Sequence, residues 1–263
     1  LSSLVFAEYI HMVTPVTRRF AAIALAAFST SLYLGVAASA YQVQPLTYFL
    51  TPTGPKSQTR LTVINTDATQ LDAELAVFSV DVDVDGKRAF TPADDQFLIF
   101  PPQASIKPGA AQSFQVRYIG DPAITQGRIY VVRVKQLNIN YVEREVKPGT
   151  TSRVAIMLNF NTTAVVQPVK AHDDVAIVSN LTPLAGKDAK SVGFVATVAN
   201  SGDAVADLSA LKWRLLRDGK SEDLEIMKLK FGETSMLAPG AQRRIVLDGA
   251  LGQGAQLQLA SAG

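Results

Sequence analysis

From residue 41 onward, the chain consists of short segments in which apolar and polar residues alternate, separated by turns rich in Gly, Pro, Asn and Asp. The alternation has a period of two, and β-branched and aromatic residues are frequent, which is typical of half-buried β-strands. No long amphipathic helix is apparent. The pattern predicts strands at 60–65, 71–80, 96–100, 113–119, 128–139 and 152–166, and a second set at 175–179, 192–200, 211–217, 224–229 and 243–247.

The two sets of strands are separated by a break in the pattern. Gln167-Pro168 ends the longest apolar segment, and a polar stretch follows over 169–174. A chain of 263 residues is also too long for one small sandwich. We therefore predict an all-β protein with two immunoglobulin-like β-sandwich domains in tandem, the first over 41–168 and the second over 169–263.

The residues before 41 have the pattern of an export signal. A plausible start, Met12, is followed by the basic pair Arg18 and Arg19, a long uncharged run, and the small residues Ala38-Ser39-Ala40. These three parts are typical of a secretory signal peptide. We expect residues 1–40 to be upstream residues plus a signal peptide cleaved after Ala40, and the mature chain to have no stable membrane insertion. An uncleaved membrane anchor is the alternative, because the uncharged run is long enough to span a bilayer.

Composition argues against several classes of function. The formal net charge is +2, and removal of residues 1–40 leaves 23 basic against 22 acidic side chains, with no basic block that would bind nucleic acid. The chain has no cysteine and two histidines, His11 and His172, of which the mature protein would keep one. Disulfides, Cys-ligated zinc and thiol nucleophiles are therefore excluded, and a catalytic triad or a multi-histidine metal site has almost no histidine to use. We expect no catalytic residues, no cofactor and no metal, and hence no enzyme.

Several motifs occur in a distinctive order along the predicted domains. One strand ends in Pro101-Pro102, a turn follows at Lys107-Pro108-Gly109, and the next strand contains Val116-Arg117. Segments 61–67 and 195–202 both end a strand with an asparagine and polar turn residues, and 236–240 forms an apolar Ala-Pro-Gly turn. In this order, and over about the whole mature length, the chain resembles the PapD-like periplasmic pilus or fimbrial chaperone family.

The resemblance implies a periplasmic protein that works by donor-strand complementation. Subunits handled by this family lack one strand of their own sandwich, and an open sheet edge with an apolar groove aggregates unless it is covered. The chaperone lends the last strand of its first domain until an outer-membrane usher replaces it. The expected partners are therefore an exported pilus or fibre subunit lacking a strand and an outer-membrane usher.

A suitable donor strand lies near the end of the first predicted domain. On a strand over 151–160, period-two geometry places four apolar side chains on one face: Val154, Ile156, Leu158 and Phe160. The first three of these fall on the family's alternating donor positions. The alternative is that they fill the core of their own domain. The preceding segment, 140–150, carries several charges and is expected to be a loop.

The chain departs from the family where the subunit's terminal carboxylate would bind. The family's arginine and lysine positions correspond to Tyr48 and Thr163, neither of which can form a salt bridge. Arg133 and Lys135 share a face of the adjacent predicted strand and are possible substitutes; the alternative is that both are merely solvated. Gln167 stands where the family commonly has an arginine in an interdomain ion pair. These departures suggest a divergent branch, for which archaic-type chaperones are one candidate.

Two other functions agree with part of the sequence. An immunoglobulin-like structural or adhesive surface protein would have the same two sandwiches and would need no subunit or usher. A hydrolase or sugar-binding enzyme on a β-sandwich would use the available carboxylates. Asp81, Asp83 and Asp85 share one strand face and could bind calcium, but their pattern fits a solvated hairpin end better.

Overall fold

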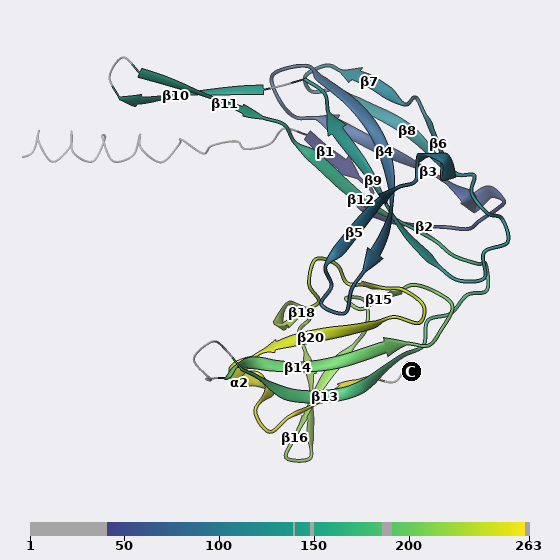
Figure 1. Ribbon diagram of the computed structural model, residues 1–263, viewed down its shortest axis with the longest axis vertical. Helices are drawn as coiled ribbons and strands as arrows, with labels where there is room; N and C mark the ends of the chain where they lie inside the picture. Colours follow the sequence, from purple (N-terminus) through teal and green to yellow (C-terminus); the bar gives the residue numbers. More distant parts are fainter. Residues whose placement is uncertain (1–40, 139, 148–149, 186–190, 261–263) are drawn as a thin grey trace, which may run out of the picture. The chain divides into compact units, whose positions relative to one another are not determined.

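The computed structural model describes residues 41–138, 140–147, 150–185 and 191–260, which are almost entirely β-structure (Figure 1). The expected signal peptide lies outside these residues. Helical structure within them is limited to short 3₁₀ turns and the four-residue helix α2 (Gly249–Gly252). None of the helices in this described part is long and apolar enough to cross a bilayer.

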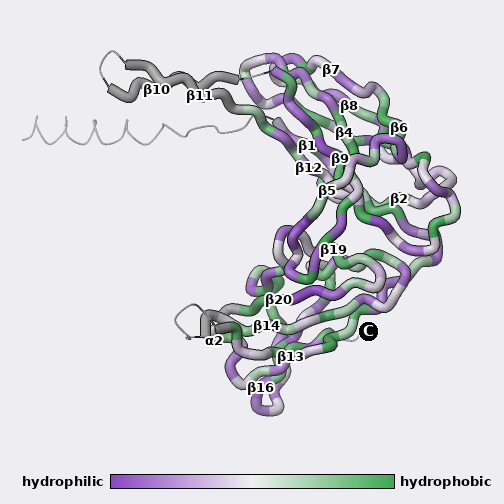
Figure 2. The backbone as a smooth tube through the Cα atoms, in the orientation of Figure 1, coloured by the Kyte–Doolittle hydropathy of each residue, from purple (hydrophilic) through white to green (hydrophobic). Residues whose placement is uncertain are grey.

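The first sandwich consists of two sheets. One has the strand order β1 (Tyr41–Gln44), β3 (Gln58–Asn65), β8 (Ala111–Tyr118) and β6 (Phe97–Phe100). The other has the order β2 (Thr47–Leu50), β12 (Asn159–Val166), β9 (Arg128–Gln136), β4 (Leu71–Val82) and β5 (Arg88–Pro92), with β7 (Gln103–Ile106) also beside β4. The alternating hydropathy along these strands is visible in Figure 2, and their inward residues form one core that includes Leu61, Val63, Phe114, Val116, Tyr130, Val132, Val134 and Ala164.

The second sandwich follows with its own core. Strands β13 (Val175–Ala185), β14 (Ser191–Asn200), β20 (Gln242–Asp248) and β18 (Leu229–Lys230) form one sheet, and β17 (Lys220–Leu224), β16 (Trp213–Arg217) and β21 (Gln256–Leu259) form the other. A short pair, β15 (Ala206–Asp207) and β19 (Met236–Leu237), completes it. The fold class is therefore two β-sandwiches in tandem, as predicted, whereas the domain boundary after residue 168 remains a prediction.

Three local predictions are wrong. The expected loop at 140–150 contains a strand, β10 (Asn140–Lys147), which pairs with β11 (Thr150–Ile156). The single strand expected at 152–166 is divided between β11 and β12, and the strand expected at 224–229 is mostly a 3₁₀ turn (Ile226–Lys228). The charged residues of 140–147 suit a two-stranded ribbon, because its faces need not enter a core.

Both sandwiches contain the same buried asparagine arrangement. Asn65 ends β3 and donates from Nδ2 to the carbonyls of Thr69 (2.7 Å) and Ile106 (3.0 Å). Asn200 ends β14 and donates in the same way to Ala204 (2.8 Å) and Leu237 (3.2 Å). A Pro-Gly turn is hydrogen-bonded to the backbone of each asparagine. The N–H of Gly109 donates to the carbonyl of Asn65 at 2.9 Å, and the N–H of Gly240 donates to the carbonyl of Asn200 at 2.8 Å.

These glycines and asparagines explain why the two motifs recur. Gly109 and Gly240 have φ values of 72° and 70°, a conformation that L side chains rarely adopt. Each asparagine amide donates to one carbonyl in the turn that follows its own strand and to one carbonyl at the end of a neighbouring strand, and so links the two. The sequence similarity of 61–67 and 195–202 thus corresponds to one structural motif used twice.

We expect Asn65→Ala and Asn200→Ala each to lower the free energy of unfolding by about 2–4 kcal/mol, because each leaves two buried carbonyls without a donor. Urea denaturation followed by tryptophan fluorescence and far-UV circular dichroism measures this loss. The control is Gln115→Ala, at an exposed position of β8, which should shift stability by less than about 0.5 kcal/mol. Equal effects from the buried and exposed variants would contradict the assignment.

Candidate functional site

The candidate site begins with a two-stranded ribbon that continues β9 and β12 (Figure 1). Strands β10 and β11 are antiparallel, with Asn140 opposite Ile156 and Val142 opposite Val154. In the part of the chain that the structure describes, neither strand has a second partner. The outer edge of each therefore presents unpaired backbone N–H and C=O groups, which can accept another extended chain.

The ribbon and the sandwich meet at an irregular step in the ladder. Lys135 and Asn140 are five positions apart along the chain, whereas their partners Asn159 and Ile156 are three apart. The two extra residues on the β9 side break the regular pairing, as in a β-bulge. One of the inserted residues, Asn138, accepts from the N–H of Asp72 over 3.0 Å and donates to the carbonyl of Gln70 over 2.8 Å.

The backbone of Leu158 anchors the other side of this step. Its carbonyl accepts the Tyr41 hydroxyl at 2.9 Å and the Gln136 N–H at 3.2 Å. Its own N–H donates to Oε1 of Gln136 at 3.3 Å. Tyr41 also donates to the carbonyl of Val134 at 3.1 Å, so two buried side chains from β1 and β9 hold the point where the ribbon leaves the sandwich.

Apolar side chains are exposed around this anchor. Leu137, Met157 and Leu158 have exposed fractions of 45%, 59% and 37%. Leu137 precedes β10, and the other two separate β11 from β12. Solvent-exposed apolar residues beside an unpaired strand edge are typical of a surface that another chain covers.

The four expected donor residues do not form one uninterrupted row. Val154 and Ile156 belong to β11, but their side chains lie outside the described part of the structure. Leu158 lies between the two strands and is partly exposed, whereas Phe160 on β12 packs against the first core, with its ring centroid 4.5 Å from that of Tyr41. For Phe160, packing in its own domain describes this structure better, and the donor role of the others stays a prediction.

Arg133 lies on the outer face of the β2-β12-β9-β4-β5 sheet. Its Nε donates to Oδ1 of Asn161 at 2.9 Å, and its guanidinium carbon lies 4.5 Å from the ring centroid of Phe78 and 5.3 Å from that of Phe90. No carboxylate of the described residues pairs with it. The guanidinium is therefore oriented by one hydrogen bond and two rings, and its terminal N–H groups can bind a carboxylate in a bidentate manner.

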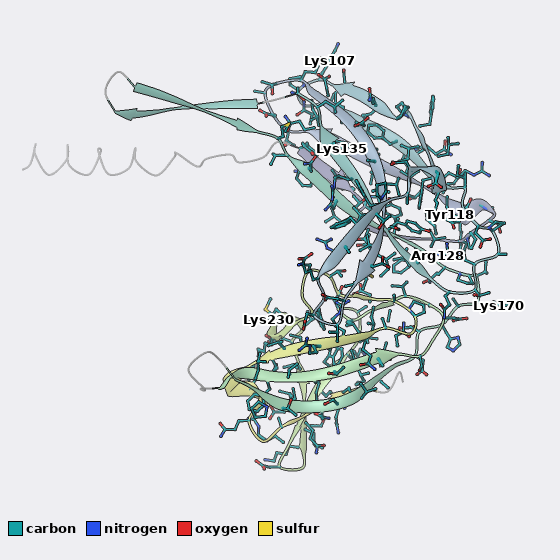
Figure 3. All side chains as sticks on the ribbon, in the orientation of Figure 1. Lys107, Tyr118, Arg128, Lys135, Lys170 and Lys230 are labelled. Atoms are coloured by element: carbon teal, nitrogen blue, oxygen red, sulfur yellow. The ribbon has the colours of Figure 1, made fainter. Side chains whose placement is uncertain are left out.

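Lys135 is the weaker of the two proposed substitutes. It lies two positions after Arg133 on β9 and therefore on the same face of that strand. Its side chain is labelled in Figure 3, and its Nζ is 3.9 Å from a carboxylate oxygen of Glu74, with both side chains partly exposed. Its charge is therefore already shared with an acidic neighbour. A surface pair of this kind contributes little to stability, and the ammonium lacks the planar fork of arginine.

Tyr48, which corresponds to the family's arginine position, lies on β2. Tyr48 points into the first core, where its hydroxyl is 3.5 Å from Oγ1 of Thr162. Its neighbour Thr47, which is exposed, pairs with Thr163 across the parallel strands β2 and β12. Thr47 and Thr163, rather than Tyr48, are thus adjacent, and neither carries a charge.

The features that bear on catalysis in the described part of the chain are its candidate metal ligands and a hollow lined by a carboxylate. No group of three or more His, Asp or Glu side chains there is arranged to hold a metal ion. A surface hollow of about 580 Å³ beside β7 contains a single carboxylate, Asp72, which accepts a hydrogen bond from Ser105 with no histidine among the lining residues. Asp83, one of the possible calcium ligands, instead accepts the N–H groups of Asp85 and Lys87 in the β4–β5 turn, both at 2.9 Å.

Comparison with known proteins gives a result at the level of the fold. The chain matches no protein-family model and no curated protein sequence. Its structure is similar to that of the YadV chaperone, with a TM-score of 0.51 and 11% sequence identity over 84% of this chain and 92% of that chain. This chain has the pilus-chaperone fold. Many solved structures match it, and the first eight are all from chaperones or chaperone complexes.

Two weaker structural similarities are to chains from chaperone complexes. One comes from a chaperone–tip adhesin complex of CFA/I fimbriae, with a TM-score of 0.48 and 9% identity over 86% of this chain and 100% of that chain. Another comes from the CsuC–CsuE chaperone–tip adhesion subunit complex of the archaic Csu pili of Acinetobacter baumannii, with a TM-score of 0.44 and 12% identity over 78% and 89%.

The Tyr41 anchor predicts a loss of stability in alkali. Burial raises the pKa of Tyr41 to about 12, against a smaller opposing effect of a hydrogen bond from the backbone of Phe160. An unfolded tyrosine ionises near pH 10, so between about pH 10 and 12 the folded state holds the extra proton and stability falls as pH rises. The urea midpoint should fall less steeply through this window in Tyr41→Phe than in the wild type. Parallel profiles would contradict a buried, proton-donating Tyr41.

Proposed function

We propose that this chain is a periplasmic chaperone that stabilises pilus or surface-fibre subunits by donor-strand complementation and delivers them to an outer-membrane usher. The observation that carries the proposal is the β10–β11 ribbon, whose outer edges have no partner strand among the described residues. The chaperone fold supports it. Because the proposed function is to cover a sheet edge, it needs no catalytic group.

The free edge of β11 suits a client that lacks a strand. Thr150–Ile156 is an extended segment with one side of its backbone unpaired, and the exposed Met157 and Leu158 continue it toward the sandwich. An added strand would gain backbone hydrogen bonds along this edge. Burial of Val154, Ile156 and Leu158 in a client groove would contribute about 5–9 kcal/mol before the costs of ordering.

Arg133 is the group best placed to bind a carboxylate at the end of the client chain. Asn161, to which it is hydrogen-bonded, lies on β12, the strand that leads out of the ribbon. A client paired along β11 and β12 would therefore run toward this guanidinium. A charge-assisted hydrogen bond there contributes about 1.5–3 kcal/mol. This is less than the contribution of apolar burial, so the bond would mainly fix the register in which the client strand pairs.

We expect Ile156→Glu and Leu158→Glu to abolish stabilisation of the client, because a charge cannot enter an apolar groove without a large cost. Co-expression with an exported, strand-deficient subunit encoded nearby, followed by co-purification, measures the effect. Met227→Glu is the matched control, since its side chain is largely exposed and lies in a 3₁₀ turn of the second sandwich, outside the proposed binding surface. Circular dichroism should show that all three variants remain folded.

Undiminished client yield with Ile156→Glu and Leu158→Glu would contradict the donor-strand assignment. If no exported subunit depends on this chain at all, the better interpretation is an immunoglobulin-like structural or adhesive protein. Both outcomes are visible in the same co-expression experiment.

Arg133→Gln should weaken binding of a peptide with the client's C-terminal sequence about 10- to 100-fold, because one charge-assisted bidentate contact is lost. Amidation of the peptide's carboxylate should weaken binding to the wild type equally and have little further effect on the variant. Isothermal titration calorimetry measures both. The control is Arg60→Gln, at an exposed position of β3 in the other sheet. Equal discrimination between acid and amide by wild type and Arg133→Gln would exclude Arg133 as the anchor.

A further inference from the structure

A turn of the first sandwich forms close backbone contacts with a loop of the second. The turn between β4 and β5 comprises residues 83–87, and the facing segment comprises residues 231–236, which are the loop after β18 and the first residue of β19. The N–H of Glu233 donates to the carbonyl of Gly86 over 3.0 Å, and that of Arg244 on β20 donates to the carbonyl of Val84 over 2.7 Å. The two sandwiches are therefore joined by main-chain hydrogen bonds as well as by side chains.

Two glycines make this approach possible. Gly86 and Gly232 have φ values of 80° and 82°. A Cβ added to Gly86 would lie 2.1 Å from the carbonyl oxygen of Phe231, and one added to Gly232 would lie 2.3 Å from that of Asp85. Both positions thus exclude any side chain, for conformational and for steric reasons.

Arg243 fixes the conformation of segment 231–236, which contacts the 83–87 turn. Its side chain is completely buried, with an exposed fraction of 0%. Nη1 donates to the carbonyls of Phe231 at 2.8 Å and Thr234 at 2.6 Å, and Nη2 donates to that of Met236 at 3.1 Å. One guanidinium therefore binds three backbone carbonyls, two in the loop and one at the start of β19.

This buried cation has no paired carboxylate among the described residues. Its Nε has no hydrogen-bond partner, and burial lowers the pKa of Arg243 from its ordinary value. The negative charge of Asp83, from the turn of the first sandwich, opposes that lowering. The positive charge of Arg243 is thus stabilised partly by the 83–87 turn of the first sandwich.

Ion pairs and apolar residues surround this contact. Arg88 pairs with Glu233 at 3.3 Å, and Arg244 pairs with Asp85 at 2.6 Å, all with partly exposed side chains. Exposed pairs of this kind contribute little energy but favour one register. An apolar cluster contains residues from both sandwiches: Val80, Ile129, Val131, Val165, Val205 and Met236.

We propose that Arg243 is the positioning residue of a latch, formed by residues 83–87 and 231–236, that couples the two sandwiches into one cooperative unit. This inference does not depend on the proposed chaperone function. Arginine suits the role because its planar fork presents several donors in fixed directions, whereas lysine offers a single flexible ammonium. Gly86 and Gly232 then let the two backbones meet.

Hydrogen exchange of single amides tests the latch. In the wild type, the amides of Glu233 and Arg244 should be protected because they donate across the contact. Arg243→Lys and Arg243→Met should accelerate exchange at these two amides at least tenfold. The amides of Asn65 and Leu257, which bond within the first and the second sandwich, should exchange as in the wild type. Arg214→Lys, at an exposed pair with Asp223 in the second sandwich, is the control variant and should change none of these rates.

Gly86→Ala provides a second test that leaves Arg243 in place. It should accelerate exchange at Glu233 and Arg244 to a similar extent, since the added methyl group meets the carbonyl of Phe231. Unchanged protection of the two amides in the Arg243 and Gly86 variants would overturn the proposal. So would uniform loss of protection at all four amides in Arg243→Lys, which would make Arg243 a general core residue rather than a latch.

Discussion

A buried peptide group must find a hydrogen-bond partner, and most of the distinctive features of this protein follow from how it meets that requirement where strands end. Asn65 and Asn200 satisfy carbonyls beside the Pro-Gly turns, and Arg243 satisfies three more in the second sandwich. Tyr41 and Gln136 do the same at Leu158. In each case one or two side chains form hydrogen bonds to backbone groups where strand pairing ends, and these bonds fix the relative position of two segments.

The same requirement is left open at one place, the outer edges of the β10–β11 ribbon. Proteins usually protect such edges, because unpaired backbone groups invite pairing with another chain. Here the ribbon is anchored firmly at Leu158 while its edges have no partner strand in the described residues. An anchored strand with a free edge loses little freedom when it pairs, so this arrangement suits a protein whose task is to complete another protein's sheet.

The two sandwiches meet through a different balance of forces. Exposed pairs such as Arg88–Glu233 set register at little energetic gain, whereas the Gly86–Gly232 approach and the buried Arg243 tolerate almost no substitution. Arg88 and Arg133 both approach the ring of Phe90, with guanidinium carbons 5.4 Å and 5.3 Å from its centroid. The contact between sandwiches and the candidate carboxylate site therefore share an aromatic neighbour.

The all-β class, the division into two sandwiches and the asparagine and Pro-Gly motifs could be predicted from the amino-acid sequence, because period-two alternation and positive-φ glycines are local properties. The sequence also pointed to Arg133, since parity alone puts that residue on the face opposite Val132 and Val134. Tertiary structure alone decided the rest. Met157 and Leu158 separate β11 from β12, so the single strand expected at 152–166 is divided, and pairing of β10 with β11 converted an expected loop into a strand. The partners of Arg243 and the approach of Gly86 to Gly232 join segments more than a hundred residues apart or lie within an irregular loop, and no local pattern encodes such contacts.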